Sequence, residues 1–295
     1  MTARVGIVGL GEAGGAIAAG LVEEGAEVIA YDLRLASAGG ADLRDLAARA
    51  GVGLATDLAD LAGRAEIILS LVTGGAALPV ARALAPHLRA GQLVADLNTT
   101  SPGVAEAVSE VLAPTGASFT DVAIMAAVPP YRHRVPMLAC GPGADQLAAA
   151  GLGLRVEVIE GGPGAASAVK MLRSLLVKGL ESLLLEFAVA ADRFGATDRV
   201  LRSMNGSLPT DDWRALATYL LTRTAKHGRR RGDELAEVAE MFRELGIEPG
   251  LAEAGADRLR WAGQRLTDQF ARRTPEHYQE VVDALVRPGP EPEAE

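Results

Sequence analysis

Two of the three lysines in the chain lie in one apolar segment, and their spacing suits proton transfer. Lys170, Ser174 and Lys178 are four residues apart, so on a helix they share one face. Residues 169–189 are mostly apolar, which predicts a helix buried between domains or subunits. Burial disfavours the charged form of an amine, and such an amine can exchange a proton near neutral pH. Lys170 is therefore a candidate general acid/base. The alternative is a lysine near a helix start that reaches solvent or pairs with a carboxylate.

A turn punctuated by glycines near the start of the chain indicates a nucleotide site. Residues 4–32 have the pattern of a strand, a turn, a helix and a second strand. Gly9, Gly11 and Gly14 form a G-x-G-x-x-G pattern, in which the glycines allow a tight turn, approach to a pyrophosphate and close helix–strand packing. The second strand ends at Asp32, whose carboxylate can accept hydrogen bonds from an adenosine ribose. This context favours a dinucleotide site over an ordinary glycine turn.

The elements that must position these residues alternate between strand and helix through the first half of the chain. This α/β alternation predicts a Rossmann fold, a mostly parallel doubly wound sheet with right-handed crossovers. Ligands of such sheets bind outside the carboxyl ends of the strands. The predicted cofactor contacts are therefore residues at four strand ends: Gly9, Leu10, Gly11, Glu12, Ala13, Gly14, Asp32, Val72, Thr73, Asn98 and Thr99.

The alternation stops near residues 161–164, and only helical periodicity follows. We therefore predict a dinucleotide-binding domain over residues 1–163 and an all-α substrate and dimerisation domain over residues 164–288. Residues 289–295 are rich in proline and acid, which predicts a disordered tail.

The composition excludes several classes of function. A net charge of −9 and an aromatic content of 4% argue against a nucleic-acid surface. The single cysteine, Cys140, excludes an internal disulfide and suits a reducing cytoplasm. The most apolar stretch carries too many charges for a membrane span, and the first strand begins too soon after Met1 for a signal peptide. The four scattered histidines indicate no metal site. We expect a cytoplasmic protein that binds no metal, membrane or nucleic acid.

The segment GGPGAASAVKMLRS, residues 161–174, resembles the catalytic signature of the β-hydroxyacid dehydrogenase and 6-phosphogluconate dehydrogenase superfamily, G-x-x-G-x-x-x-x-x-K-x-x-x-N. Three further segments resemble its motifs in order: GLGEAGGAIAAGL its cofactor loop, DLNTTSP its fifth-strand motif and DVAIMAA its substrate strand. The helical remainder resembles a branch whose C-terminal domain has no assigned function. The resemblance implies an NAD(P)-dependent oxidoreductase in which Lys170 is the general acid/base and residue 174 helps to orient it.

The chain departs from this signature where a substrate would bind. Ser174 stands in place of the asparagine, and Met125 and Ala126 begin a segment that replaces a serine-glycine-glycine turn. An anionic substrate would then need other partners. Arg132 and Arg134 follow the substrate strand on a predicted loop, and arginines suit carboxylate or phosphate recognition. The alternative is a solvated surface loop.

A second basic cluster, KHGRRR, spans residues 226–231. It is either a charged helix start or a contribution to the site of a second subunit, because the helical domain of one subunit can complete the other's site in related folds. The apolar helix near Lys170 also needs a covering surface, and we therefore expect a homodimer.

Together these features predict an oxidoreductase that interconverts a small, anionic hydroxy acid, or a related alcohol, with its carbonyl form. Asp32 favours NAD, because its charge would repel a 2′-phosphate, whereas Arg34 leaves NADP open. One alternative is an imine reductase, against which Lys170 counts, since those enzymes place Asp or Tyr at the proton-donor position. Another is a non-catalytic NAD-binding regulator, which Ser174 leaves open. The substrate, the direction and any decarboxylation are not indicated.

Overall fold

The computed structural model describes residues 2–37, 40–173, 194–204, 213–244 and 246–286. The chain divides into two compact units, residues 1–176 and residues 177–295, which we describe separately. Ser174 and Lys178 lie outside the described residues.

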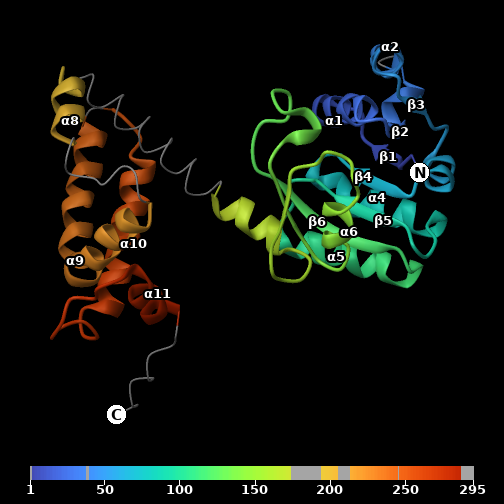
Figure 1. Ribbon diagram of the computed structural model, residues 1–295. Coiled ribbons are helices and arrows are strands. Elements are labelled where there is room, and N and C mark those ends of the chain that lie inside the picture. The colour runs from blue at the N-terminus through green and yellow to red at the C-terminus, as the bar shows by residue number, and fades with distance from the viewer. Residues whose placement is uncertain (1, 38–39, 174–193, 205–212, 245, 287–295) are drawn as a thin grey trace. The chain divides into compact units, whose positions relative to one another are not determined.

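The first unit is built on one sheet, whose strands in the described residues are β1 (Arg4–Val8), β2 (Glu27–Tyr31), β3 (Gly53–Leu54), β4 (Ile67–Ser70), β5 (Leu93–Asp96), β6 (Ser118–Ile124), β7 (Met137–Cys140) and β8 (Val156–Val158). Their spatial order is β3-β2-β1-β4-β5-β6-β7-β8 (Figure 1). Neighbouring strands are parallel except for β6 and β7, which pair antiparallel. This confirms the predicted doubly wound, mostly parallel sheet.

Helices cover both faces of this sheet. Their bounds are α1 (Glu12–Glu23), α2 (Gly40–Ala50), α3 (Leu58–Arg64), α4 (Ala77–Leu84), α5 (Pro102–Leu112) and α6 (Ala144–Ala148). Buried side chains of α1, α2 and α6 pack on one face, and those of α3, α4 and α5 pack on the other.

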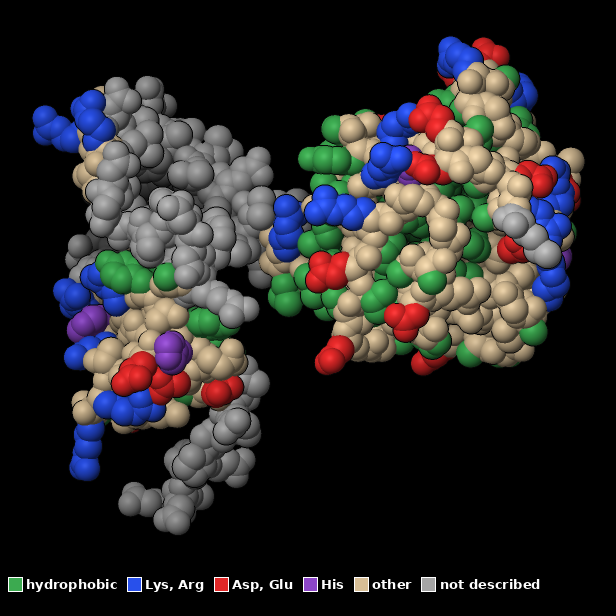
Figure 2. All heavy atoms as spheres, viewed as in Figure 1, with side chains coloured by type: hydrophobic (Ala, Val, Ile, Leu, Met, Phe, Trp, Pro, Cys, Tyr) green, Lys and Arg blue, Asp and Glu red, His purple; other side chains and the backbone are tan. Residues whose placement is uncertain are grey.

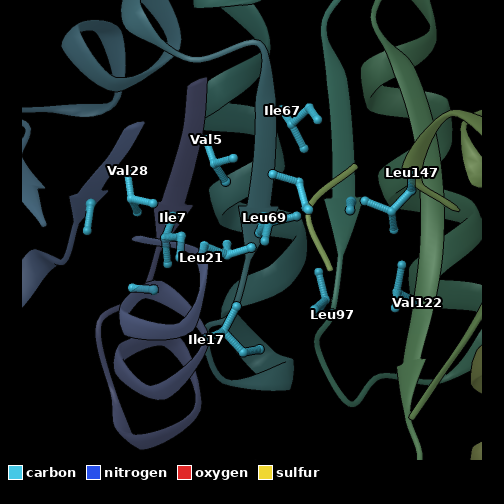
Figure 3. Close-up of a cluster of buried hydrophobic side chains, with 14 of the residues drawn as sticks. Val5, Ile7, Ile17, Leu21, Val28, Ile67, Leu69, Leu97, Val122 and Leu147 are labelled. Carbon is cyan, nitrogen blue, oxygen red and sulfur yellow. The ribbon is translucent and has the colours of Figure 1, made fainter. Parts of the chain in front are cut away.

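Alternate residues of the central strands enter the two cores. On β1, Val5 and Ile7 join the core under α1, whereas Val8 joins the opposite one. Figure 3 shows Ile17 and Leu21 of α1 meeting the side chains of β1 and its neighbours. Because both faces are buried, these strands are apolar at nearly every position rather than at every second one.

The order of the strands reverses at β1, which lies between β2 and β4. A ligand of a doubly wound sheet binds at such a switch point, outside the carboxyl ends of the strands. The glycine loop follows β1 directly, so the topology places it at this point. Helix α1 ends just before Gly25, which adopts a φ of +87° that favours glycine.

The described helices of the second unit are α8 (Thr197–Met204), α9 (Trp213–Glu244), α10 (Gly250–Leu266) and α11 (Tyr278–Val286). Helices α9 and α10 approach closely at Gly228 and Gly263, where a Cβ on Gly228 would lie 2.8 Å from the Cα of Gly263. A small core of Ala225, Leu266 and Val281 joins α9, α10 and α11. Among the described residues, no helix has the length and apolar character needed to cross a membrane.

Candidate functional site

The loop between β1 and α1 has the conformation that a pyrophosphate site requires. Gly9 has a φ of +98°, and a Cβ there would lie 2.3 Å from the carbonyl oxygen of Leu71. A Cβ on Gly14 would lie 1.9 Å from the carbonyl oxygen of Gly9. On Gly11, by contrast, a Cβ would meet only Nη2 of Arg34, at 3.9 Å. Packing therefore requires the outer two glycines, whereas the middle one leaves its backbone open to a ligand.

This open side of the loop borders a cleft of about 660 Å³. The predicted cofactor residues that line the cleft are Gly9, Gly11, Glu12, Ala13, Gly14, Asp32, Val72 and Thr73. An apolar wall that the glycine pattern does not reveal is formed by Leu33, Leu58, Ala76 and Val80. Leu33 is 79% exposed, so its large apolar side chain is accessible to a ligand in the cleft. A polar loop beside an apolar wall fits a dinucleotide, whose pyrophosphate is charged and whose adenine is flat and weakly polar.

Asp32, at the end of β2, ties the glycine loop to its neighbouring strand. Its buried carboxylate accepts hydrogen bonds from the backbone N–H groups of Leu10, at 2.8 Å, and Arg34, at 2.9 Å. The guanidinium of Arg34 donates two more bonds, from Nε at 3.0 Å and Nη2 at 2.8 Å. Burial acts to raise the pKa of Asp32, but these hydrogen bonds outweigh it and leave the pKa lowered. The carboxylate is therefore ionised but already paired, which weakens the repulsion of a 2′-phosphate that its charge alone would cause.

Asn98, just after β5, holds the ends of two strands together. Its Oδ1 accepts a hydrogen bond from the backbone N–H of Val72 at 2.6 Å, and its Nδ2 donates to Oγ of Ser70 at 3.0 Å. Nδ2 also donates to Asp96. Both amide hydrogens are thus used within the protein. Asn98 and Leu10, both predicted as cofactor contacts, do not line the cleft and instead support the loops that do.

The helix that carries Lys170, residues 165–173 in the described part, is fastened to β6 by one carboxylate. Asp121 is 1% exposed and accepts hydrogen bonds from the backbone N–H groups of Gly164, at 3.1 Å, and Ser167, at 3.0 Å. The hydroxyl of Ser167 donates a third bond to it, at 2.7 Å. A negative charge at a helix N-terminus also interacts favourably with the helix dipole. Asp121 therefore sets the position from which Lys170 projects.

The structure brings Lys170 to the carboxyl end of β5. Its Nζ donates a hydrogen bond to Oγ1 of Thr99, at 2.8 Å. Met125, at the end of β6, packs against a cluster that includes Ala166 of the same helix, and Ala126 beside it is exposed. The lysine, the predicted fifth-strand motif and the predicted substrate strand therefore meet at one edge of the sheet, the edge that also carries the glycine loop.

Arg132 and Arg134, predicted as substrate-binding residues, pair with two acids at the end of α1. Arg132 donates two hydrogen bonds to the carboxylate of Glu23, at 2.7 and 2.9 Å, and Arg134 pairs with Glu24. The loop that bears them lies beside α1 (Figure 1). Glu23 follows Gly11 by twelve residues, or roughly 18 Å along a helix. Two acids at a helix C-terminus are disfavoured by its dipole, and the arginines compensate that charge.

A second buried carboxyl, Asp96, stands opposite Asp121 in the pairing of β5 with β6. It is nearly inaccessible, and burial raises its pKa from the ordinary 3.8 to about 6. Hydrogen bonds from Asn98 oppose this rise, whereas the charge of Asp121 adds to it. Within the described residues, no group of three or more His, Cys, Asp or Glu side chains could hold a metal ion.

Two family models match the chain. The NAD binding domain of 6-phosphogluconate dehydrogenase matches residues 4–145, and a domain of unknown function, DUF1932, matches residues 191–262. A conserved hypothetical protein from Sinorhizobium meliloti 1021 is 37% identical, with 97% of this chain and 96% of that one covered and a TM-score of 0.63. The conserved protein MTH1747, whose structure is described as similar to 3-hydroxyacid dehydrogenases, is 31% identical over 87% of this chain and 96% of that one, with a TM-score of 0.62.

Other proteins are similar over less sequence or in fold alone. L-threonate dehydrogenase of Cupriavidus necator is 31% identical over 186 residues, which are 60% of each chain. A reductive aminase from Aspergillus terreus shares the fold, with a TM-score of 0.67 at 17% identity over 97% of this chain and 100% of that one.

The fold and the glycine cleft define an NAD(P)-dependent oxidoreductase of the dehydrogenase and reductase class. More narrowly, the chain belongs to the family of the Sinorhizobium protein and MTH1747. In this chain, DUF1932 follows the NAD binding domain of 6-phosphogluconate dehydrogenase. This confirms the superfamily, the branch and the cofactor class that the motifs predict.

The Asp32–Arg34 pair makes a prediction about cofactor choice. We expect NAD(H) to bind more tightly than NADP(H) by ~10-fold, or about 1.4 kcal/mol. Asp32→Ser should narrow this gap, because it frees Arg34 for the 2′-phosphate, and Arg34→Ala should widen it, because Asp32 is left uncompensated. Fluorescence titration of both cofactors measures the ratio. Arg49→Ala, which removes an exposed arginine outside the cleft, is the matched control. An NADP(H) preference in the unmodified protein would contradict the prediction.

The raised pKa of Asp96 makes a prediction about stability. The folded state holds this proton more tightly than the unfolded chain, so ionisation removes stability as the pH rises from about 4 to 6. Asp96→Asn abolishes that loss, and its free energy of unfolding relative to the parent should rise by up to roughly 3 kcal/mol between about pH 4 and pH 7. Urea unfolding at several pH values measures this difference. For Asp145→Asn, which changes an exposed carboxyl, the difference in free energy of unfolding from the parent should not depend on pH. The same independence of pH for Asp96→Asn would refute the raised pKa of Asp96.

Proposed function

We propose that the protein interconverts a small hydroxy acid, or a related alcohol, with its carbonyl form, and that Lys170 is the general acid/base. The observation that carries this proposal is the contact between Nζ of Lys170 and Oγ1 of Thr99, at 2.8 Å. It puts an amine at the sheet edge where the glycine loop begins its cofactor cleft. The 31% identity to L-threonate dehydrogenase and the described similarity of MTH1747 to 3-hydroxyacid dehydrogenases support this class of substrate.

The proposed chemistry divides between the cofactor and this lysine. The nicotinamide, when bound, supplies or accepts the hydride. In reduction, the Lys170 ammonium donates a proton to the substrate oxygen as that oxygen gains negative charge. In oxidation, the neutral amine accepts the proton of the substrate hydroxyl. An ammonium has three donors, so Thr99 can keep its hydrogen bond and orient Lys170 while a second donor reaches the substrate.

The groups around Lys170 give it a defined position. Asp121 anchors the first turn of its helix, one turn before the lysine, and Thr99 contacts its far end. Anchoring at both ends limits the movement of a long side chain and favours a productive geometry. Arg132 and Arg134 play no part in the proposed site, because Glu23 and Glu24 bind them.

We also propose that the protein acts as a homodimer. Three apolar side chains beside Lys170, those of Val169, Met171 and Leu172, are 41%, 45% and 66% exposed. The sequence stays mostly apolar to residue 189. Apolar surface of this kind on one helix marks an interaction surface, and a second copy of the chain would cover it.

The dimer proposal predicts a light-scattering mass near twice that of the 30.5 kDa chain at micromolar concentration. Leu172→Glu should shift the protein toward monomer, because it places a charge in the apolar surface. Leu33→Glu, which changes an exposed leucine of the cofactor cleft, should leave the mass unchanged. A folded monomeric parent protein would rule the dimer out.

The lysine proposal predicts the kinetics of two variants. Lys170→Ala should lower turnover by roughly 10²–10⁴-fold, the range for loss of general acid/base catalysis. Lys170→Arg should restore little, since a guanidinium hardly releases its proton near neutral pH. The affinity for NADH should stay near that of the parent, because the glycine loop is untouched. NADH oxidation with a panel of carbonyl acids measures turnover, and fluorescence titration measures affinity.

Lys178→Ala, eight residues further along the sequence, serves as the matched control and should have the smaller effect. Near-parental turnover of Lys170→Ala would remove this lysine from the mechanism. A panel of cyclic imines tested beside the carbonyl acids separates the imine reductase alternative, and NADH binding without turnover on either panel would favour a regulator.

A further inference from the structure

One face of α9 in the helical unit gathers basic side chains around a hollow. Arg223, Lys226, His227 and Arg230 recur at helical spacing and therefore share one face of α9. Together with Thr222 and Thr274 they line a hollow of about 330 Å³, which we call the α9 pocket. Figure 2 shows Lys and Arg side chains gathered beside a histidine on the surface of this unit.

The charge of the α9 pocket is opposite to that of the whole protein. The chain has a net charge of −9, yet none of the described residues that line the pocket is acidic. Arg223 and Lys226 contribute two positive charges three residues apart, where like charges on a helix repel each other. A bound anion would relieve this repulsion, and the surrounding field would draw an anion to this point.

Two of these cations are held in place by neighbouring side chains. The guanidinium of Arg223 lies 5.0 Å from the ring centroid of Tyr219 and also donates a hydrogen bond to its hydroxyl oxygen. Nζ of Lys226 donates to Oγ1 of Thr274 at 3.3 Å, which brings the segment after α10 against the pocket. The Thr274 oxygen accepts this bond, so its own hydrogen can be donated to a ligand. The donors are therefore arranged before any ligand arrives, which reduces the entropy that binding would cost.

We propose that the α9 pocket binds a small phosphorylated anion, either inorganic phosphate or a phosphate monoester. A guanidinium fork, an ammonium and a hydroxyl donor match a tetrahedral group with several negatively charged oxygens. The volume of about 330 Å³ is at the lower end of small-molecule sites, so the pocket fits a compact ligand. This site lies in the second unit and is additional to the proposed proton transfer by Lys170.

Calorimetric titration of the full-length protein tests the proposal. Inorganic phosphate and glycerol 3-phosphate are titrated separately at constant ionic strength, with saturating NADH present so that the glycine loop does not contribute a phosphate site. A lower Kd for inorganic phosphate would indicate a site for free phosphate, and a lower Kd for glycerol 3-phosphate would indicate a site for a phosphate monoester. Lys226→Ala and Arg223→Ala should each raise the Kd of that ligand by roughly 10-fold, the loss expected for one charge-assisted hydrogen bond. Lys226→Gln, which keeps most of the side chain, should have the same effect if the alanine variant folds poorly.

Arg258→Ala is the matched control. It removes one positive charge from α10, where the guanidinium lies 5.0 Å from the centroid of the Trp261 ring and does not line the pocket. Its Kd should equal that of the parent. Absence of binding by both ligands, or equal weakening by Arg258→Ala and Lys226→Ala, would overturn the proposal. So would tighter binding of a DNA duplex than of either small ligand, because that would indicate a polyanion surface. The readout is binding alone, so it stands apart from the outcome of the Lys170 experiments.

Discussion

The site of this protein depends on the buried carboxylate of Asp121. A buried charge is costly unless it is hydrogen-bonded, and Asp121 accepts its three bonds from the N–H and O–H donors of Gly164 and Ser167. Since these donors form the first turn of the helix that carries Lys170, the requirement holds that helix on β6. Lys170 follows Ser167 by three residues and therefore lies on a neighbouring position of the same helix surface. The contact with Thr99 depends on this chain of constraints.

Buried polar side chains also hold neighbouring segments together at the other strand ends. Asp32 joins the end of β2 to the glycine loop, and Asn98 joins the ends of β4 and β5. Each of these three side chains is buried and uses its polar atoms within the protein. They support the loops at the strand ends, whereas the residues that line the cleft come from those loops and from the helices α1, α3 and α4. Their hydrogen bonds give the cofactor cleft and the lysine a common rigid base, which suits a reaction that needs close placement of two reactants.

Charge is compensated locally in the first unit. Glu23 and Glu24 at the end of α1 attract Arg132 and Arg134, and Arg132 adopts a φ of +54°, a rare conformation for a residue with a side chain. The ion pairs offset the cost of that conformation. In the α9 pocket of the second unit, the described lining residues include Arg223 and Lys226 and no acid. This difference separates a structural use of arginine from the proposed binding use.

Local patterns in the sequence predict the sheet, the glycine loop and Asp32 at the end of β2, because they depend on sterics and periodicity within a few residues. Gly9 and Gly14 illustrate this, since each has no room for a Cβ. The places of Arg132 and Arg134 could not be predicted in this way, because their partners are more than a hundred residues away in sequence. The pairing of Asp121 with Ser167, the apolar wall of the cleft and the contact of Lys170 with Thr99 likewise join distant segments. The sequence by itself therefore determined the strands and helices of the first unit and the class of cofactor. Tertiary structure alone decided which charged groups face one another. Electrostatic pairing depends on distances between side chains, and only the assembled sheet and helices set those distances.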